Sequence, residues 1–418
     1  MSNFISKISS IRRNPEAKTV ASNFMWLSAL QVAGYVFPLI TMPYLARVIG
    51  VDGFGKIAFA AAIMVWIQTI TDWGFNLTAI RDVAQNRDNK EKVSDIFSNV
   101  LWARCLLMFA SLIILLVAVC IIPQLRAEWD VILISFLMIP GHVLFPDWFF
   151  QAVERMKYTS ILNVLTKLFF TLAVFIFIKK PQDYLIQPLL TSIGFIISGL
   201  ISLYIIIVKW EIKLKKPDLG KAITCLKEST NVFVNHLLPN LYNSFSTILV
   251  GIWGGGNAVG ILDGGNKFVQ VGNQVINSIS RAFYPFLSRK IDKHNLYIKV
   301  NIGITTLIAL FFFIAAPYIV DIFLTPEFCN SSIIIRIRAV SMIFYAISMT
   351  YGNNYILINH QDKLLRQISV KASIIGFIIA WPLVYHLSYI GASITVTISL
   401  GLIALFSYIG AKKIQKLI

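Results

Sequence analysis

Residues 100–122 read VLWARCLLMFASLIILLVAVCII, a run of 23 residues in which Arg104 is the single charge. A helix of this length rises about 34 Å, which is enough to cross the roughly 30 Å hydrocarbon core of a bilayer. A segment so poor in polar residues cannot supply the water-facing side of a soluble helix. The run therefore predicts a transmembrane helix.

The rest of the chain has the same character. Of its 418 residues, 57% are hydrophobic and 14% are charged, and the mean hydropathy is +0.72. A soluble domain has roughly 25% charged residues, so much of this surface must face lipid. Segments of mostly apolar residues predict twelve transmembrane helices, at 22–46, 57–80, 100–122, 130–150, 160–178, 186–208, 232–253, 264–285, 299–321, 333–358, 371–386 and 391–410.

The net charge of +17 raises the question of a nucleic-acid partner, and the distribution of that charge disfavours one. Lys and Arg stand in short clusters between apolar runs, as topology signals do. The sequence has no zinc-finger spacing, no RNA-binding aromatic motif and no long basic helix. Its four cysteines show no metal-ligand spacing. We therefore expect no nucleic-acid partner, no metal and no cofactor.

The basic clusters predict the orientation of the chain. If the N-terminal segment, with Lys7, Arg12, Arg13 and Lys18, is cytoplasmic, that side holds 26 of the 37 Lys and Arg residues. The opposite side then holds 7, and the other four lie inside predicted helices. Because cytoplasmic loops are enriched in Lys and Arg, this split predicts that both termini are cytoplasmic.

The longest polar stretch divides the chain into two similar halves. We expect an N-terminal six-helix bundle at 1–208, a cytoplasmic linker at 209–230 and a C-terminal six-helix bundle at 231–418. A short repeat fits this division. Gly50-Val-Asp-Gly-Phe-Gly55 follows the first predicted helix, and Gly255-Gly-Asn-Ala-Val-Gly260 follows the seventh. Duplicated halves are common in transporters.

Polar residues form stripes at helical spacing on the first two predicted helices of each half. Such groups usually face a cavity or a partner helix, because they are costly in hydrocarbon. The stripes indicate two bundles around a central polar cavity, although hydrogen bonds between packed helices would also explain the amides. The candidate cavity residues are Gln31, Arg47, Gln68, Asn76, Asn240, Asn243, Lys267, Gln270, Gln274, Asn277 and Arg281.

Four cations lie inside predicted helices. Lys267 and Arg281 favour the cavity interpretation, since a cation in a closed apolar contact would need a buried anion. They lie about 21 Å apart along one helix. Arg104 and Lys167 stand within a few residues of predicted cytoplasmic ends, where long side chains can reach the membrane surface.

Two further residues are candidates for ion coupling. Asp72 lies deep in the second predicted helix, and it is either a proton or cation site or the ion-pair partner of Arg81 or Arg281. His236 stands on the polar stripe of the seventh predicted helix.

Three stretches of sequence have a distinctive pattern. They are FPLITMPYLARVIG at 37–50 with GFG at 53–55, DWGFNLTA at 72–79 with Arg81-Asp82, and DWFFQ at 147–151. Together they resemble the O-antigen flippases (Wzx-type proteins) of the polysaccharide transporter family, within the multidrug/oligosaccharidyl-lipid/polysaccharide (MOP) exporter superfamily. The likeness also covers the length, the twelve predicted helices and the two halves.

The resemblance implies an all-α integral membrane fold of MOP/MATE type in the bacterial inner membrane. It implies a transporter rather than an enzyme, which moves undecaprenyl-diphosphate-linked oligosaccharide repeat units from the cytoplasmic to the periplasmic leaflet by alternating access. It also implies other polysaccharide-assembly proteins as partners. Cationic cavity residues hold the diphosphate in related flippases, and Arg47, Lys267 and Arg281 are the candidates here.

Three other functions were weighed against this one. A cation-coupled drug antiporter of the same superfamily would be expected to have acids deep in the cavity, whereas cations outnumber acids on these stripes. A membrane glycosyltransferase or polymerase would be expected to have a sizeable extramembrane loop with paired acids, which the sequence lacks. A scaffold would not need polar stripes on four helices.

Overall fold

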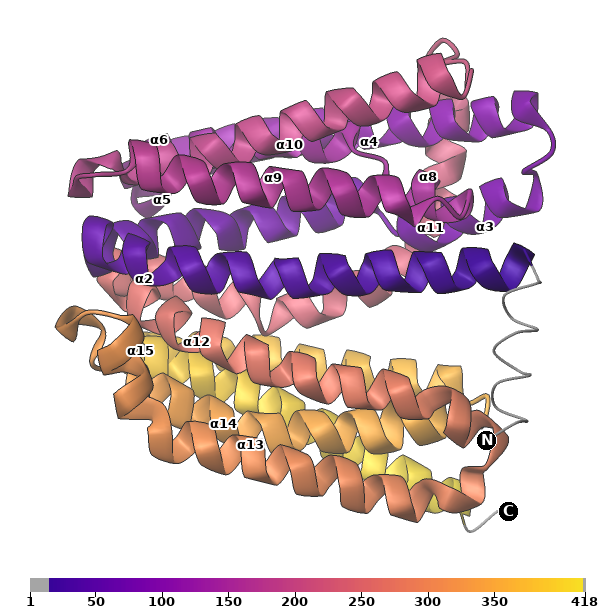
Figure 1. Ribbon diagram of the computed structural model, residues 1–418. Coiled ribbons are helices and arrows are strands. Elements are labelled where there is room, and N and C mark those ends of the chain that lie inside the picture. Colours follow the sequence, from indigo (N-terminus) through magenta and orange to yellow (C-terminus); the bar gives the residue numbers. More distant parts are fainter. Residues whose placement is uncertain (1–14, 416–418) are drawn as a thin grey trace. The chain divides into compact units, whose positions relative to one another are not determined.

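A computed structural model describes the backbone of residues 15–415 and the side chains in that range except those at 15–21, 24, 27–29, 32 and 35. The basic residues Lys7, Arg12 and Arg13 and the side chain of Lys18 therefore lie outside the described residues. The described part is helical throughout and includes no strand (Figure 1). It has nine helices that are long and apolar enough to cross a membrane. An all-helical, multi-pass membrane protein is thus confirmed, and the number twelve stays a prediction.

Three of these long helices contain a break in the backbone. The breaks lie at Gly50 in α2 (Pro15–Asp72), at Gly255 in α12 (Ser244–Arg289) and at Ser388 in α15 (Asp362–Gln415). Each break falls where the sequence predicts a turn between two transmembrane helices. Each of these three elements therefore consists of two helical segments that meet at the break.

The chain forms two compact units. Among the described residues, unit 1 comprises those up to Tyr44, Ile67–Lys179 and Leu185–Val234. Unit 2 comprises Leu45–Trp66, Lys180–Tyr184 and the described residues from Asn235 onward. The middle of α2 thus belongs to unit 2. The predicted bundle boundaries at 208 and 231 remain a prediction.

Unit 1 contains both ends of α2 and a series of shorter helices. These are α3 (Phe75–Gln85), α4 (Lys90–Ile121), α5 (Pro123–Ala127), α6 (Trp129–Phe136), α7 (Met138–Leu144), α8 (Asp147–Ala152), α9 (Met156–Phe177), α10 (Ile186–Tyr204), a π-helical turn at Ile205–Lys209 and most of α11 (Leu219–Leu237). A short 3-10 helix at Pro181–Leu185 precedes α10.

Local sequence explains where several of these helices begin and end. Asn89 caps α4, because its side chain accepts a hydrogen bond from the amide of Lys92 at 3.0 Å. Gly74 separates α2 from α3 with a φ of 82°, a conformation that glycine adopts without strain. Pro146 lies between α7 and α8, where it cannot donate a backbone hydrogen bond.

Glycine also lets α7 and α10 approach closely. A Cβ atom added at Gly141 would lie 2.4 Å from the backbone nitrogen of Ile196. Small residues at such contacts are the usual means of helix packing inside membranes.

The predicted linker at 209–230 is structured in its second half. Leu219–Leu237 form α11, which packs on the start of α3. The Trp73 indole donates to the carbonyl of Leu226 at 3.0 Å, and its ring stacks on Phe233 with centroids 3.9 Å apart. Thr78 and Ser229 share a buried hydrogen bond of 2.7 Å. This segment is therefore part of unit 1.

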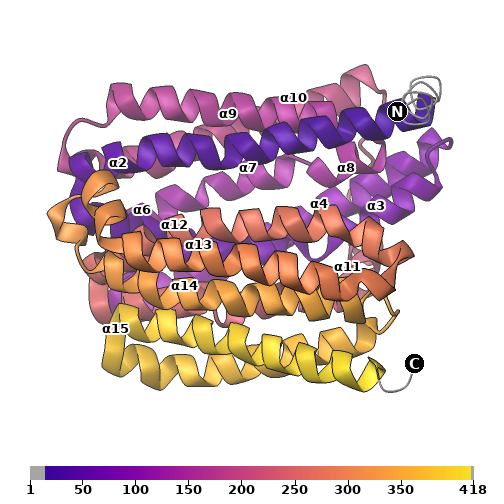
Figure 2. The same ribbon diagram turned by 60° about the horizontal axis from the view of Figure 1, so that its bottom comes forward.

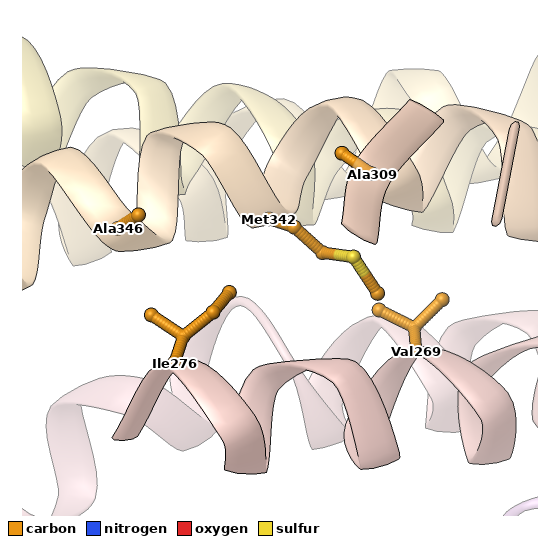
Figure 3. Packing of buried hydrophobic residues seen from close by; sticks show 5 residues of the cluster. All are labelled: Val269, Ile276, Ala309, Met342 and Ala346. Carbon is orange, nitrogen blue, oxygen red and sulfur yellow. The ribbon is translucent and has the colours of Figure 1, made fainter. Parts of the chain in front are cut away.

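Unit 2 is built from long helices. Besides α12 and α15 it contains the 3-10 helices Leu238–Leu241, Ile291–Lys293 and Pro326–Phe328, α13 (His294–Phe323), α14 (Ser331–Ser348) and a π-helical turn at Met349–Ile356. Its core lies between α12, α13 and α14. Figure 3 shows Val269 and Ile276 of α12 pointing at Met342 of α14, and all three are fully buried.

The two glycine-bounded repeats form two corners that pack against each other in unit 2. Gly50 has φ 67° and ψ −178°, and Gly255 has φ 71° and ψ −173°. A Cβ atom added at Gly55 would lie 1.8 Å from the carbonyl oxygen of Gly256, and one at Gly260 would lie 2.2 Å from that of Val51. Equivalent positions of the repeat thus adopt the same unusual conformation, for which glycine is required.

Candidate functional site

The longest polar stripe runs along α12 in unit 2. Lys267, Gln274 and Asn277 are partly exposed, and Gln270 and Arg281 are exposed. The core side of the same helix holds Val269, Gly272 and Ile276, all buried. Within unit 2, the stripe therefore lies outside the hydrophobic core.

Few contacts within unit 2 satisfy the charges of this stripe. Lys267 pairs with Asp263 one turn earlier at 3.5 Å, and the lysine side chain stays 41% exposed. Asn277 accepts a hydrogen bond of 2.7 Å from the Tyr345 hydroxyl. Arg281 forms no ion pair with a carboxylate of the described residues. Lys267 thus has an anion one helical turn away, whereas Arg281 has no carboxylate partner among the described residues.

The other predicted residues of unit 2 lie on different elements. Arg47, on the middle part of α2, is exposed and donates to the carbonyl of Ile322 at 3.5 Å. His236 and Asn243 are exposed, at the end of α11 and at the start of α12. Asn240, on the short helix between them, is partly buried and has a partner of its own.

The predicted residues of unit 1 lie on α2 and α3. Gln31 is exposed, and Gln68 is partly buried. Asn76 has a buried amide oxygen with no hydrogen-bond partner in the described part of the chain. An unpaired buried acceptor is costly, so Asn76 is the residue of this group with the strongest unmet demand for a donor.

Asp72 belongs to a cluster of charged residues inside unit 1. Its Oδ1 atom accepts a hydrogen bond of 2.8 Å from the Arg104 guanidinium and lies 2.9 Å from Nε2 of His142. Arg104 also donates to the carbonyls of His142 and Val143, at 3.1 and 3.4 Å. Within unit 1, the partner of Asp72 is therefore Arg104 with His142, whereas the predicted partner Arg81 pairs with Asp82 at 2.9 Å. The alternative partner Arg281 belongs to unit 2 and stays a prediction.

Burial in this cluster is uneven. The Arg104 side chain is only 1% exposed, whereas Asp72 and His142 are 22% and 20% exposed. The prediction that Arg104 reaches the membrane surface is thus wrong, because its guanidinium is held by Asp72 and two carbonyls. Asp72 and His142 therefore keep part of their surface exposed within unit 1.

The cluster lies beside two interruptions of helical backbone. Asp72 is the last residue of α2, before Trp73 and Gly74 with positive φ. His142 is three residues before Phe145, where α7 ends in extended backbone. Asp147 follows at the start of α8 and interacts electrostatically with Arg104, Asp72 and His142. Broken helices that meet at charged groups are typical of ion and substrate sites in transporters.

Sequence reasoning missed two residues. His142 stands in a predicted apolar helix with no local motif, and only its place near Pro146 and Asp147 hints at a role. Arg338 lies within α14 and is only 6% exposed, and no motif in the sequence indicates that it is buried. Its Nε and Nη1 atoms have no hydrogen-bond partner among the described residues.

Within unit 2, the structure places the five stripe residues along α12. Within unit 1, it brings Asp72 together with its partners Arg104 and His142. A cavity that unites residues of both units stays a prediction.

Comparison with known proteins gives the family. Residues 20–290 match the family described as "Polysaccharide biosynthesis protein". A protein of Escherichia coli named "Putative O-antigen transporter" is 27% identical over 91% of this chain and 94% of its own length. A protein of Shigella dysenteriae with the same name is 26% identical over 92% and 98%.

Solved structures with the same fold are also transporters. The lipid II flippase MurJ in an inward closed conformation has a TM-score of 0.76 at 13% identity, over 92% of this chain and 87% of its own. An inward-facing multidrug resistance MATE family transporter of the MOP superfamily has a TM-score of 0.70 at 15% identity, over 94% and 97%. Since the family match covers more than half of the sequence and these likenesses give the fold, the chain belongs to the polysaccharide biosynthesis protein family, with the fold of MOP-superfamily exporters.

Proposed function

We propose that this protein is a flippase that moves undecaprenyl-diphosphate-linked oligosaccharide repeat units, such as those of O-antigen, from the cytoplasmic to the periplasmic leaflet of the bacterial inner membrane. Both termini face the cytoplasm in this proposal, and other polysaccharide-assembly proteins supply and consume the substrate. The protein works by alternating access and makes or breaks no covalent bond. The stripe of polar and cationic residues along α12 is the observation that supports this function most directly.

The stripe has the chemistry that such a substrate needs. A diphosphate is strongly hydrated, and the cations of Lys267 and Arg281 offset the loss of that hydration by charge-assisted hydrogen bonds. The side chains of Gln270, Gln274 and Asn277 between them offer donors and acceptors to sugar hydroxyls. Because the two cations lie about 21 Å apart along the helix, they serve successive stages of passage.

The remaining predicted residues complete the substrate path in this proposal. Gln31, Gln68 and Asn76 supply hydrogen-bonding groups from unit 1. Arg47, Asn240 and Asn243 supply them from unit 2. Asn76 is the strongest candidate of these six residues, because its buried amide oxygen lacks a hydrogen-bond donor in the described part of the chain.

Asp72 is the residue we propose for proton coupling. It shares Oδ1 between the permanent cation of Arg104 and the imidazole of His142. A proton taken up by Asp72 neutralises the carboxylate that pairs with Arg104, at the place where α2 and α7 both end. His236 is the second candidate for coupling, and its exposure at the end of α11 leaves it without the neighbours that Asp72 has.

Complementation of a flippase-deficient strain tests the function. We expect the wild-type chain to restore surface polysaccharide and to clear accumulated lipid-linked repeat units. The Lys267→Gln/Arg281→Gln variant should lower transport at least tenfold at unchanged membrane abundance. Arg289→Gln is the matched control, since Arg289 is an exposed cation at the end of the same helix and lies outside the stripe.

The outcome also separates the rival functions. Full transport by the double variant removes the two cations from the mechanism. A drug antiporter would change the resistance of the strain to cationic drugs and leave the lipid-linked pool unchanged. If the protein were a polymerase or glycosyltransferase, its presence would alter the length or composition of the sugar chain. Transport of the lipid-linked repeat units would not depend on it.

A further inference from the structure

A groove opens between α2 and α9 inside unit 1, away from the residues discussed above. The two helices lie side by side in both views (Figures 1 and 2). The lining consists of seven residues: Trp26, Ala33, Val36 and Phe37 from α2, and Ile161, Val164 and Leu165 from α9. Its volume is about 590 Å³, within the usual range for ligand pockets. Six of the seven side chains are aliphatic or phenyl and the seventh is an indole, so the groove fits a hydrocarbon ligand.

Hydrogen bonds hold the two helices together on either side of this groove. At one end, the Asn23 side chain donates to the carbonyl of Glu154 and accepts from the amide of Met156, at 3.0 and 3.2 Å. At the other end, the Tyr44 hydroxyl donates to the carbonyl of Ile178 at 2.7 Å. The groove between these contacts is therefore a fixed feature of the helix pair.

A cation lies beside the groove. Lys167 stands at the middle of α9, and a Cβ atom added at Gly34 of α2 would lie 3.1 Å from its Nζ. The absence of a side chain at position 34 is thus what lets the ammonium group approach α2. The lysine is partly buried and forms no ion pair with a carboxylate of the described residues. An ammonium group in the middle of an apolar helix calls for an anionic partner.

We propose that this α2–α9 groove binds the isoprenoid chain of a polyprenyl phosphate, and that Lys167 holds the adjacent phosphate. The proposal rests on the proposed function, in which a polyprenyl-linked substrate passes through the protein. The geometry supports both parts of the ligand, because the apolar lining accepts the chain and the ammonium group lies at the level of Gly34, between Ala33 and Val36. Lys167 stands at mid-helix, whereas a phospholipid at rest keeps its phosphate at the membrane surface. We therefore assign the site to a substrate that is being transported.

The test is lipid binding to the purified full-length protein, measured by native mass spectrometry with undecaprenyl phosphate, uncharged undecaprenol and phosphatidylglycerol as probes. Lys167→Gln should weaken undecaprenyl phosphate binding at least tenfold and leave undecaprenol binding unchanged. Lys167→Arg should retain it. Val164→Phe, which fills the groove, should weaken both polyprenyl probes.

Two controls lie on or just beyond the same helix. Ile176→Phe places the same phenylalanine side chain at an exposed position that does not line the groove, and Lys179→Gln removes a cation beyond the end of α9. Both should bind all probes as the wild type does. Equal binding of undecaprenyl phosphate by wild type and Lys167→Gln overturns the proposal. The proposal is also overturned if phosphatidylglycerol binds as tightly as undecaprenyl phosphate and its binding is lost in the same variants. The groove would then hold ordinary bilayer lipid.

Complementation keeps this proposal distinct from the flippase function. The wild-type chain could fail to restore surface polysaccharide while Lys167 and Val164 still control polyprenyl phosphate binding. In that case the proposed transport function is wrong and the proposed binding site is supported. If the chain restores the polysaccharide and the variants bind the probe normally, the site falls and the transport assignment stands.

Discussion

Arg104 in unit 1 and Arg281 in unit 2 both stand inside apolar helices, but their surroundings are opposite. Arg104 is 1% exposed and bonds to Asp72 and two carbonyls. Arg281 is exposed and has no carboxylate partner in the described chain. The neighbours of a charged residue in a membrane helix, more than its position along that helix, therefore decide its role. The contacts of Arg104 point to a structural role, and Arg281 has no such contacts among the described residues.

The largest effect is expected from removal of the buried cation. We expect Arg104→Met to destabilise unit 1 by about 3–5 kcal/mol, because the Asp72 carboxylate would lose its charged partner. Thermal unfolding of the detergent-solubilised protein measures the effect. The double variant Asp72→Asn/Arg104→Met should recover part of the loss. A single variant as stable as wild type would show that the pair contributes nothing to the fold.

Arg338 is a second buried arginine, and we expect its replacement to have the opposite effect on stability. Its Nε and Nη1 atoms lack partners in the described residues, and an unpaired buried polar group costs about 1–3 kcal/mol. Arg338→Met keeps much of the volume and removes that cost, so stability should be unchanged or should rise by up to this amount. The same unfolding assay measures it, and a loss as large as that of Arg104→Met would reveal a partner for this guanidinium.

The hydrogen bond between Tyr345 and Asn277 connects the core of unit 2 to the α12 stripe. Tyr345→Phe should cost about 1 kcal/mol, the usual net value of one hydrogen bond. If the bond orients Asn277 toward the substrate, transport falls as well, though less than in the Lys267→Gln/Arg281→Gln variant. Comparison of transport rates at matched membrane abundance would show this, and an unchanged rate would limit the bond to a structural role.

The smallest effect is expected at Asp263. Its ion pair with Lys267 spans one helical turn and is partly exposed, and such pairs contribute about 0.3–0.5 kcal/mol. Asp263→Asn should therefore leave the unfolding temperature nearly unchanged and should keep transport at the wild-type level, because Lys267 remains. Transport as low as that of Lys267→Gln would mean that the pair, rather than the lysine alone, takes part.

The helices and the repeat could be predicted from the sequence because both are local. Apolar runs of transmembrane length mark the helices, and the spacing of Gly50 and Gly255 marks two equivalent corners with the same backbone conformation. The five residues of the α12 stripe follow from helical periodicity alone.

The charged cluster of unit 1 could not be predicted in the same way. Asp72 and Arg104 are 32 residues apart, and Asp72 and His142 are 70 apart. No periodicity within one helix indicates which of several cations faces a given carboxylate, since that depends on how three helices pack. For the same reason, Arg104 was predicted to reach the membrane surface, whereas its guanidinium is buried against Asp72.

The two glycine corners of unit 2 have a consequence for how this protein can vary. Gly55 faces the backbone of Gly256, and Gly260 faces the backbone of Val51, without room for a methyl group at either place. Neither duplicated segment can therefore mutate alone: a bulkier residue or an inserted one in the first corner would require a compensating change some two hundred positions downstream. We expect homologous sequences to retain or to lose these glycines jointly.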